Sequence, residues 1–408
     1  MLRKRELADD NGMKVSLLTG GGDPTYALPL CSALTSKGLH VDFIGGDAMA
    51  NAEAVKAENC KYYNLRGDQN ARAPILRKVA RILTYYYKLI KYSVMTDSRL
   101  FHILWPSRLW PSRFVYFDRT ILNIFYKILG KQLAYTAHNI NEGERDKNDT
   151  FLNRMTLRFM YKFVDHIFVH TDKMKLQLIH SFHINDSKIT VIPFGINNVV
   201  PKSGLTEMEA KRVLNVADHH RTLLFFGLIA PYKGLEFLVS ALNILKNRGN
   251  DWRLIIAGSI KKGHNEYWAN IENMIEQHDL SGNIMRIIEF IPDQNVERYF
   301  KAADVAILPY RHIFQSGVLL LAYNFGLPVI AADVGALRQD IIEGETGFIF
   351  RAESPEDLAE KISQYFASDL YRNLKSNRKR IIDYASKQYS WHTIGEITST
   401  AYSSLLKT

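Results

Sequence analysis

Cysteine is nearly absent from this chain, whose 408 residues include only Cys31 and Cys60. Two cysteines cannot form the disulfide framework of a small secreted protein, and these two do not have the spacing of a zinc site. Motifs of the HExxH and CxxC types are also missing, and no DxD sequence lies in a suitable loop. We therefore expect a protein of a reducing compartment that binds no metal ion and needs no bound cofactor.

Long apolar runs and a secretion signal are missing as well. The longest apolar stretch, residues 316–337, is interrupted by Asn324, Pro328 and Asp333, which fits a buried helix and strand rather than a membrane span. The first residues, MLRKRELADDNG, are charged and lack the apolar core of a signal peptide. We expect a cytoplasmic protein whose residues 1–12 form a flexible tail.

Acidic residues are outnumbered by basic ones. The chain has 52 lysines and arginines against 42 aspartates and glutamates, a formal net charge of +10. Such an excess favours an anionic partner, which could be nucleic acid, anionic lipid or a phosphorylated substrate. No recognised nucleic-acid-binding motif accompanies the basic residues, so nucleic acid is not expected as a partner.

The basic residues are densest between residues 66 and 113, where ten lysines and arginines accompany two acids. A helical pattern over residues 72–92 predicts one basic face, formed by Arg77, Arg81, Lys88 and Lys91. It predicts a second, apolar face, formed by Ile75, Val79, Ile82, Tyr86 and Leu89. Such a helix suits an anionic membrane surface. A solvated basic face above an ordinary core stripe is the alternative.

Apolar runs of strand length alternate with helical patterns along the whole chain. In the first half they occupy residues 14–18, 41–44, 101–104, 132–136, 166–170 and 190–192. In the second half they occupy residues 223–226, 254–257, 285–289, 305–308 and 329–332. This alternation predicts an α/β protein with two doubly wound parallel sheets. The first strand and its glycine turn lack the GxGxxG spacing, so a dinucleotide cofactor is not expected.

The segment after residues 305–308 carries the clearest sign of a binding site. A polar loop ends at Gln315, Ser316 and Gly317, where an apolar helical pattern begins. Serine is a favoured first cap of a helix, and Gly326 stands where this helix would end. A strand, loop and helix start in this order direct loop amides and the positive end of a helix dipole toward an anion.

Four segments of the second half resemble the family 4 (group 1) retaining glycosyltransferases, which have the GT-B fold. They are FFGLIAPYKGLEFLVSAL (225–242), LIIAGS (254–259), FIPDQNVERYFKAADVAILPYR (290–311) and QSGVLLLAYNFGLPVIAADVGALRQDIIEGETGFIF (315–350). In the first half, YTAHN (135–139) and VIPFGIN (191–197) extend the similarity.

The resemblance implies two Rossmann-like domains that face a cleft. Residues 13–199 would form the acceptor-side domain, and residues 200–388 the domain that binds the donor nucleotide. A C-terminal helix, at about residues 389–408, would cross back to the first domain.

The same resemblance implies a metal-independent hexosyltransferase that moves a sugar from a nucleoside diphosphate sugar to a glycan or a lipid-linked acceptor. The departing diphosphate gains negative charge, so it requires fixed cations and amides. Lys233 stands at the family's phosphate-binding lysine, and His138 at a histidine that faces the cleft. We also predict a diphosphate-binding role for Ser316, Gly317, Val318 and Arg311. Near the acceptor we expect Gly20, Gly21, Gly22 and Gln315.

Several positions depart from the family pattern. Leu228 replaces a frequent arginine, and Ile313 and Leu321 replace a pair of glutamates in the donor segment. We interpret the chain as a glycosyltransferase of cell-surface polysaccharide biosynthesis that works at the inner face of the cell membrane. The departures leave two alternatives, a catalytically weakened GT-B binding or partner subunit and a GT-B sugar-nucleotide epimerase.

Overall fold

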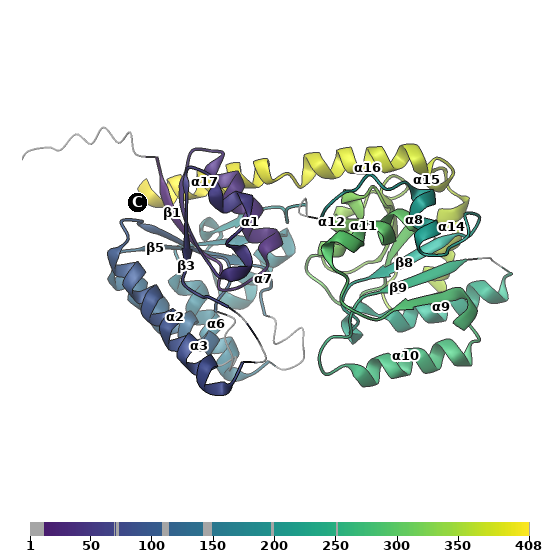
Figure 1. The fold of residues 1–408 in the computed structure, drawn as a ribbon, viewed down its shortest axis with the longest axis horizontal. Helices are drawn as coiled ribbons and strands as arrows, with labels where there is room; N and C mark the ends of the chain where they lie inside the picture. Colours follow the sequence, from purple (N-terminus) through teal and green to yellow (C-terminus); the bar gives the residue numbers. More distant parts are fainter. Residues whose placement is uncertain are drawn as a thin grey trace, which may run out of the picture. The chain divides into compact units, whose positions relative to one another are not determined.

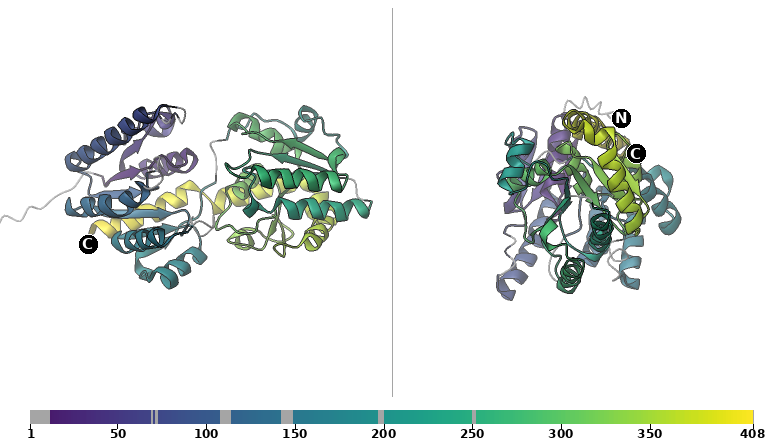
Figure 2. Two further views of the ribbon diagram at one scale, coloured as in Figure 1. Left: turned by 90° about the horizontal axis from the view of Figure 1, so that it is seen from below. Right: turned by 90° about the vertical axis from the view of Figure 1, so that its right-hand side faces the viewer.

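The computed structural model describes residues 12–68, 70, 73–107, 114–141, 149–196, 200–249 and 252–407. The chain forms two compact units (Figures 1 and 2). Unit 1 comprises Met1–Pro193 together with Trp391–Thr408, and unit 2 comprises Phe194–Ser390. The predicted boundaries were residues 199 and 389. Of the predicted flexible tail, residues 1–11 lie outside the described part of the chain.

Unit 1 is built on a seven-stranded parallel sheet with the strand order β3-β2-β1-β4-β5-β6-β7. Its strands are β1 (Lys14–Leu18), β2 (His40–Gly45), β3 (Cys60–Asn64), β4 (Leu100–Ile103), β5 (Gln132–Ala137), β6 (His166–Val169) and β7 (Ile189–Val191). Most positions of the central strands are buried, which explains why they appear in the sequence as continuous apolar runs.

Helices cover both faces of this sheet. They are α1 (Pro24–Thr35), α2 (Ile75–Met95), α3 (Phe114–Phe117), α4 (Asn123–Ile128), α6 (Phe151–Phe163), α7 (Asp172–Phe182) and α17 (Trp391–Lys407). A π-helical turn, η3 (Asp118–Leu122), joins α3 to α4. Short 3-10 turns are η1 (Asp47–Met49), η2 (Glu53–Lys56) and η4 (Asp186–Lys188). Helices α2, α3 and α6 lie on one side of the sheet, and α1 and α17 on the other (Figure 1).

The C-terminal helix α17 completes the core of unit 1. Tyr402 is fully buried and its hydroxyl forms a hydrogen bond with His102 of β4. Gly395 lies so close to α1 that an added Cβ would stand 3.0 Å from the Cβ of Ala33. The end of the chain is therefore an integral part of the unit that contains its beginning.

Unit 2 contains a six-stranded parallel sheet with the strand order β10-β9-β8-β11-β12-β13. Its strands are β8 (Thr222–Phe226), β9 (Arg253–Ala257), β10 (Ile284–Ile287), β11 (Val305–Leu308), β12 (Val329–Ala332) and β13 (Gly347–Phe350). Its helices are α8 (Glu207–Val213), α9 (Leu235–Asn247), α10 (Asn265–Gln277), α11 (Asp293–Ala302), α12 (Gly317–Asn324), α13 (Leu337–Asp340), α14 (Pro355–Ala367), α15 (Asp369–Arg372) and α16 (Leu374–Gln388). Its 3-10 turns are η5 (Pro231–Lys233) and η6 (Ser281–Asn283).

Two parallel sheets with helices on both faces confirm the predicted doubly wound α/β class. Each connection between neighbouring parallel strands brings the next helix start to the carboxyl-terminal edge of its sheet, where ligands bind in such folds. In the described part of the chain, no helix is both long and apolar enough to cross a bilayer.

Candidate functional site

The loops at the carboxyl-terminal edge of the unit 2 sheet are packed against one another. Gly234 has a positive φ of 63°, and a Cβ added there would lie 2.0 Å from the carbonyl oxygen of Pro309. A side chain at residue 234 would therefore push the turn η5 away from the end of β11. This close approach fixes Lys233, the residue that precedes the glycine.

Lys233 is a buried cation. Its side chain is only 5% exposed, and its Nζ lies 3.4 Å from the carbonyl oxygen of Phe226 and 5.1 Å from the ring centroid of Tyr310. Among the described residues, no carboxylate lies within ion-pair distance of it. Burial lowers the pKa of this ammonium group. A buried cation with such weak partners gains most from an anionic ligand.

The start of α12 lies beside Lys233. The Ser316 side chain caps the helix by accepting a hydrogen bond from the Leu319 amide at 3.3 Å. A Cβ added to Gly227 would lie 3.1 Å from Lys233 Nζ and 3.5 Å from a methyl group of Val318. The ammonium group and the helix start therefore border the same space. In the described structure, the first two helical amides, of Gly317 and Val318, donate no hydrogen bond. They are available to an anion.

Arg311 is engaged elsewhere. Its guanidinium group donates hydrogen bonds to Glu236 and Glu353, and it lies 4.5 Å from the ring centroid of Phe237. A diphosphate would have to compete with both carboxylates for this group. Lys233 is therefore the stronger of the two predicted diphosphate-binding cations.

The Gln315 side chain forms a hydrogen bond with a carboxyl group that was not predicted from the sequence. Its Nε2 donates to Asp340 at 3.1 Å, and Tyr389 donates to the other oxygen of the same carboxyl at 2.9 Å. The Gln315 Oε1 atom is buried and accepts no hydrogen bond from the described residues. Burial raises the pKa of Asp340 to about 6. Asp340 and Tyr389 were missed because neither belongs to the local pattern around Gln315.

His138 follows β5 in unit 1 and lies within an aromatic cluster. Its ring stacks on Trp105 with centroids 4.2 Å apart, and the Tyr26 ring meets it edge-on at 4.6 Å. Its Nδ1 lies 3.0 Å from Nε2 of His170. These contacts fix the orientation of the imidazole.

The tautomer of His138 follows from its neighbour. Burial lowers the pKa of His170 to about 4, so this ring is neutral at physiological pH. His170 Nδ1 donates to the carbonyl oxygen of Ile192 at 3.3 Å, which leaves its Nε2 as an acceptor. His138 therefore donates from Nδ1, and its own Nε2 is the acceptor in the neutral ring.

The predicted acceptor loop, Gly20, Gly21 and Gly22, packs against unit 1 itself. A Cβ on Gly20 would lie 2.2 Å from the Trp105 carbonyl oxygen, and one on Gly22 would lie 2.1 Å from the Trp105 ring. A Cβ on Gly21 would meet the Arg66 guanidinium group at 2.3 Å. The glycines thus hold the tryptophan that stacks on His138.

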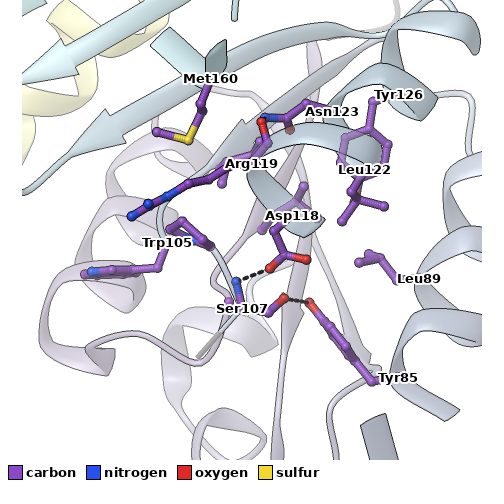
Figure 3. A pocket seen from close by; sticks show the side chains of 14 residues that line it. Tyr85, Leu89, Trp105, Ser107, Asp118, Arg119, Leu122, Asn123, Tyr126 and Met160 are labelled. Atoms are coloured by element: carbon purple, nitrogen blue, oxygen red, sulfur yellow. Dashed lines mark hydrogen bonds between the residues drawn. The ribbon is translucent and has the colours of Figure 1, made fainter. Parts of the chain in front are cut away.

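A small hollow with a cavity volume of about 30 Å³ lies beside this loop and was not predicted (Figure 3). Asp118 of η3 is buried next to it and accepts hydrogen bonds from the Ser107 amide and the Tyr86 hydroxyl at 2.5 and 2.7 Å. Burial raises the pKa of Asp118. The remaining walls are mainly apolar or aromatic, with Leu18, Tyr85, Leu89, Ile103, Trp105, Leu122, Tyr126 and Met160 among them.

The predicted basic face of α2 is only partly present. Lys88 and Lys91 are exposed, and the Arg77 side chain is 67% exposed. The prediction was wrong for Arg81, whose side chain is 21% exposed and bonds to Asp68. Ile75 and Val79 were also assigned to the wrong face, since they are 65% and 45% exposed. In the part of the chain that the structure describes, no cluster of three or more histidines, cysteines or acids could hold a metal ion.

In comparison with known proteins, each half of the chain matches a glycosyltransferase family model. Residues 207–388 match the family model "Glycosyl transferases group 1", and residues 20–198 match "Glycosyltransferase Family 4". The D-inositol 3-phosphate glycosyltransferase of Corynebacterium glutamicum is 24% identical over 86% of this chain and 84% of its own length. That of Corynebacterium aurimucosum is 26% identical over 64% of this chain and 63% of its own length.

Solved structures show the same fold. The sucrose-phosphate synthase of Thermosynechococcus elongatus superposes with a TM-score of 0.75 at 18% identity, covering 97% of this chain and 99% of that one. The Anabaena protein HepE in complex with UDP and glucose superposes with a TM-score of 0.71 at 16% identity, covering 96% of this chain and all of that one.

Proposed function

Because the chain belongs to the family 4 (group 1) glycosyltransferases and has their GT-B fold, we propose that it transfers a sugar from a nucleoside diphosphate sugar to a glycan or a lipid-linked acceptor. The glycosidic bond is made with retention of configuration and without a metal ion. The product belongs to cell-surface polysaccharide biosynthesis, and the protein works at the cytoplasmic face of the membrane.

The main support for this proposal is the buried position of Lys233 beside the start of α12. Cleavage of the donor leaves new negative charge on the diphosphate, and catalysis requires preorganised positive groups at that point. A buried ammonium group beside the first amides of α12 meets this requirement. Both groups are fixed before the donor binds, so little reorganisation accompanies charge development.

The acceptor side of the proposal rests on His138. Its Nε2, which is buried in the structure, is the nitrogen proposed to accept a hydrogen bond from an acceptor hydroxyl, because Nδ1 is committed to His170. The stacking on Trp105 holds the ring in one orientation. In a retaining reaction of this family the departing phosphate takes the acceptor proton, so His138 positions the hydroxyl and is not the base.

The experiment that tests the proposal is a binding measurement on the full chain without metal. UDP, GDP, ADP, TDP and the common nucleoside diphosphate sugars that contain them are screened by thermal shift. A ligand that binds the native state raises the melting temperature. We expect one nucleoside diphosphate to raise it. Lys233→Ala should then weaken binding by about 10- to 100-fold, the loss of one charge-assisted hydrogen bond.

Lys379→Ala is the matched control, because this lysine is exposed on α16. It should bind the nucleotide as the unaltered protein does. If no nucleotide binds, the partner-subunit alternative replaces the enzyme. If the donor is recovered with an inverted sugar centre, the epimerase alternative replaces it. Release of labelled sugar to an acceptor distinguishes the proposed transferase from both.

A further inference from the structure

Three helical segments on one side of the unit 1 sheet form a continuous layer. They are α2, the α3–η3–α4 segment (residues 114–128) and α6 (Figure 1). The Tyr86 hydroxyl of α2 donates to Asp118 of the middle segment at 2.7 Å. Arg119 of the middle segment donates to Asn153 of α6, also at 2.7 Å. We call the outer surface of this layer the helical face.

The charge of the helical face has one sign. Its three segments contain ten basic residues and a single acid, Asp118, which is 6% exposed. Four of the basic side chains are exposed and form no ion pair with any described residue, namely Lys88, Lys91, Arg158 and Lys162. The surface presented by the three segments is therefore cationic.

The helical face is also unusually apolar. Of the 21 large apolar side chains that are exposed in the described residues, 14 lie on these three segments. On α2 they include Leu83, Tyr87, Ile90 and Val94, whose spacing of three to four residues places them on one outward stripe. Their exposed fractions are 66%, 67%, 40% and 59%.

The neighbouring segments continue this apolar surface. The middle segment exposes Ile121 (55%) and Ile128 (76%), and α6 exposes Phe151 (82%) and Met155 (50%). Helix α2 thus has an apolar face toward the sheet and a second one toward the outside, with Lys88 and Lys91 beside the outer stripe. A soluble protein has no reason to expose such a surface unless something covers it.

We propose that the helical face docks on an anionic lipid bilayer. The apolar side chains enter the interfacial region, and the four exposed cations lie at the level of the lipid phosphates. A protein partner is the weaker interpretation, since protein interfaces are depleted in lysine and here no exposed acid offers a complementary charge. The inference deepens the proposed function, on which it rests for the lipid-linked nature of the acceptor.

The arrangement of unit 1 links membrane docking to the binding of the acceptor. Helices α2 and α6 each follow a strand, so they begin at the carboxyl-terminal edge of the sheet. His138 lies at the same edge, directly after β5. A bilayer that covers the helical face would bring a lipid-linked acceptor to the unit that carries the predicted acceptor-binding histidine.

Vesicle sedimentation with the full chain tests the proposal. We expect binding to vesicles that contain phosphatidylglycerol and much weaker binding to pure phosphatidylcholine. The double variant Leu83→Ser/Ile90→Ser should bind about tenfold more weakly, because two apolar side chains no longer enter the interface. Lys88→Ala and Lys91→Ala should each weaken binding about fivefold at low salt, and hardly at all at high salt.

Phe290→Ser is the matched control, because Phe290 is 75% exposed but belongs to unit 2. It should leave sedimentation unchanged. Absence of binding to phosphatidylglycerol vesicles would overturn the proposal, as would binding that the Leu83→Ser/Ile90→Ser variant leaves intact. A protein dimer in solution that this variant dissociates would also overturn it, by showing that a second copy covers the face.

Failure of this inference can be told apart from failure of the proposed function. The vesicle-binding variants lie in unit 1, so nucleoside diphosphate binding at Lys233 should be unchanged in them. Conversely, Lys233→Ala should sediment with vesicles as the unaltered protein does. Loss of nucleotide binding with intact vesicle binding, or the reverse, identifies which of the two statements is wrong.

Discussion

At the scale of single residues, the candidate donor site depends on buried ionisable groups that lack an opposite charge. Lys233 and Asp340 both lie in unit 2. Desolvation lowers the pKa of Lys233 and raises the pKa of Asp340, and both shifts favour the neutral form of the group. Such groups cost stability in the absence of a partner. The presence of such groups near the start of α12 is typical of a site that binds a ligand.

Asp340 predicts a pH dependence of stability with a definite sign. Its folded pKa of about 6 lies above the value of about 3.9 in an unfolded chain. Between these values the folded protein binds more protons, so stability falls as pH rises from about 4 to 6 and then levels off. The fall should not exceed about 3 kcal/mol. Denaturant unfolding of unit 2 across this range measures it.

Asp340→Asn should flatten this part of the profile, because an amide cannot ionise. The exposed Asp293 of α11 provides the control, and Asp293→Asn should retain the slope. Equal slopes in the unaltered protein and in Asp340→Asn would show that another group is responsible.

Sequence patterns were sufficient to predict some of these site residues but not others. Lys233 and Ser316 were found because each belongs to a local motif, a turn with a following glycine and a helix cap. The hydrogen bond between Asp340 and Tyr389 joins residues far apart in the chain, and no spacing rule predicts it. The engagement of Arg311 with Glu236 and Glu353 is likewise a property of the folded unit.

At the scale of elements, burial explains several of the strands that were predicted from the sequence, although the buried strand β13 was not predicted. β11 and β12 occupy the predicted residues 305–308 and 329–332, because every position in them is buried. β3 was not predicted, since its sequence CKYYN is polar and only partly buried at the sheet edge. The orientation of α2 was mistaken because both of its faces are apolar and only tertiary packing selects the inner one.

The contact between α17 and α1 predicts a strong effect of one glycine. Gly395→Leu should destabilise unit 1 by about 1–3 kcal/mol, because a Cβ there would already lie 3.0 Å from the Cβ of Ala33 and 3.1 Å from its carbonyl oxygen. Thr400→Leu, at an exposed position of the same helix, should change stability by less than about 0.5 kcal/mol. Urea unfolding of both variants checks this, and equal midpoints would contradict it.

At the scale of the whole molecule, the chain has two separate cores. The buried apolar cluster of unit 2 is formed entirely by residues between 196 and 389. The alternation of strands and helices was sufficient to predict two doubly wound sheets from sequence. It could not specify the outer surface of unit 1, because exposure depends on how three segments lie side by side.

Two cores predict two thermal transitions. In calorimetry, the nucleoside diphosphate that binds should raise the transition of unit 2 and leave that of unit 1 in place, since the proposed contacts lie in unit 2. Gly395→Leu should lower the other transition, which assigns it to unit 1. A single transition that moves as a whole under both changes would show that the units unfold together.

The return of α17 to unit 1 also has a consequence for biosynthesis. A ribosome must translate roughly 200 residues between the end of the first part of unit 1 and the start of α17. At about 5–20 residues per second this takes on the order of 10–40 s. During that interval unit 2 is being synthesised, and the nascent unit 1 still exposes the surface around Ala33 and His102 that α17 will bury. The half that is made first is therefore the half that is finished last, and it is the one on which chaperones would act.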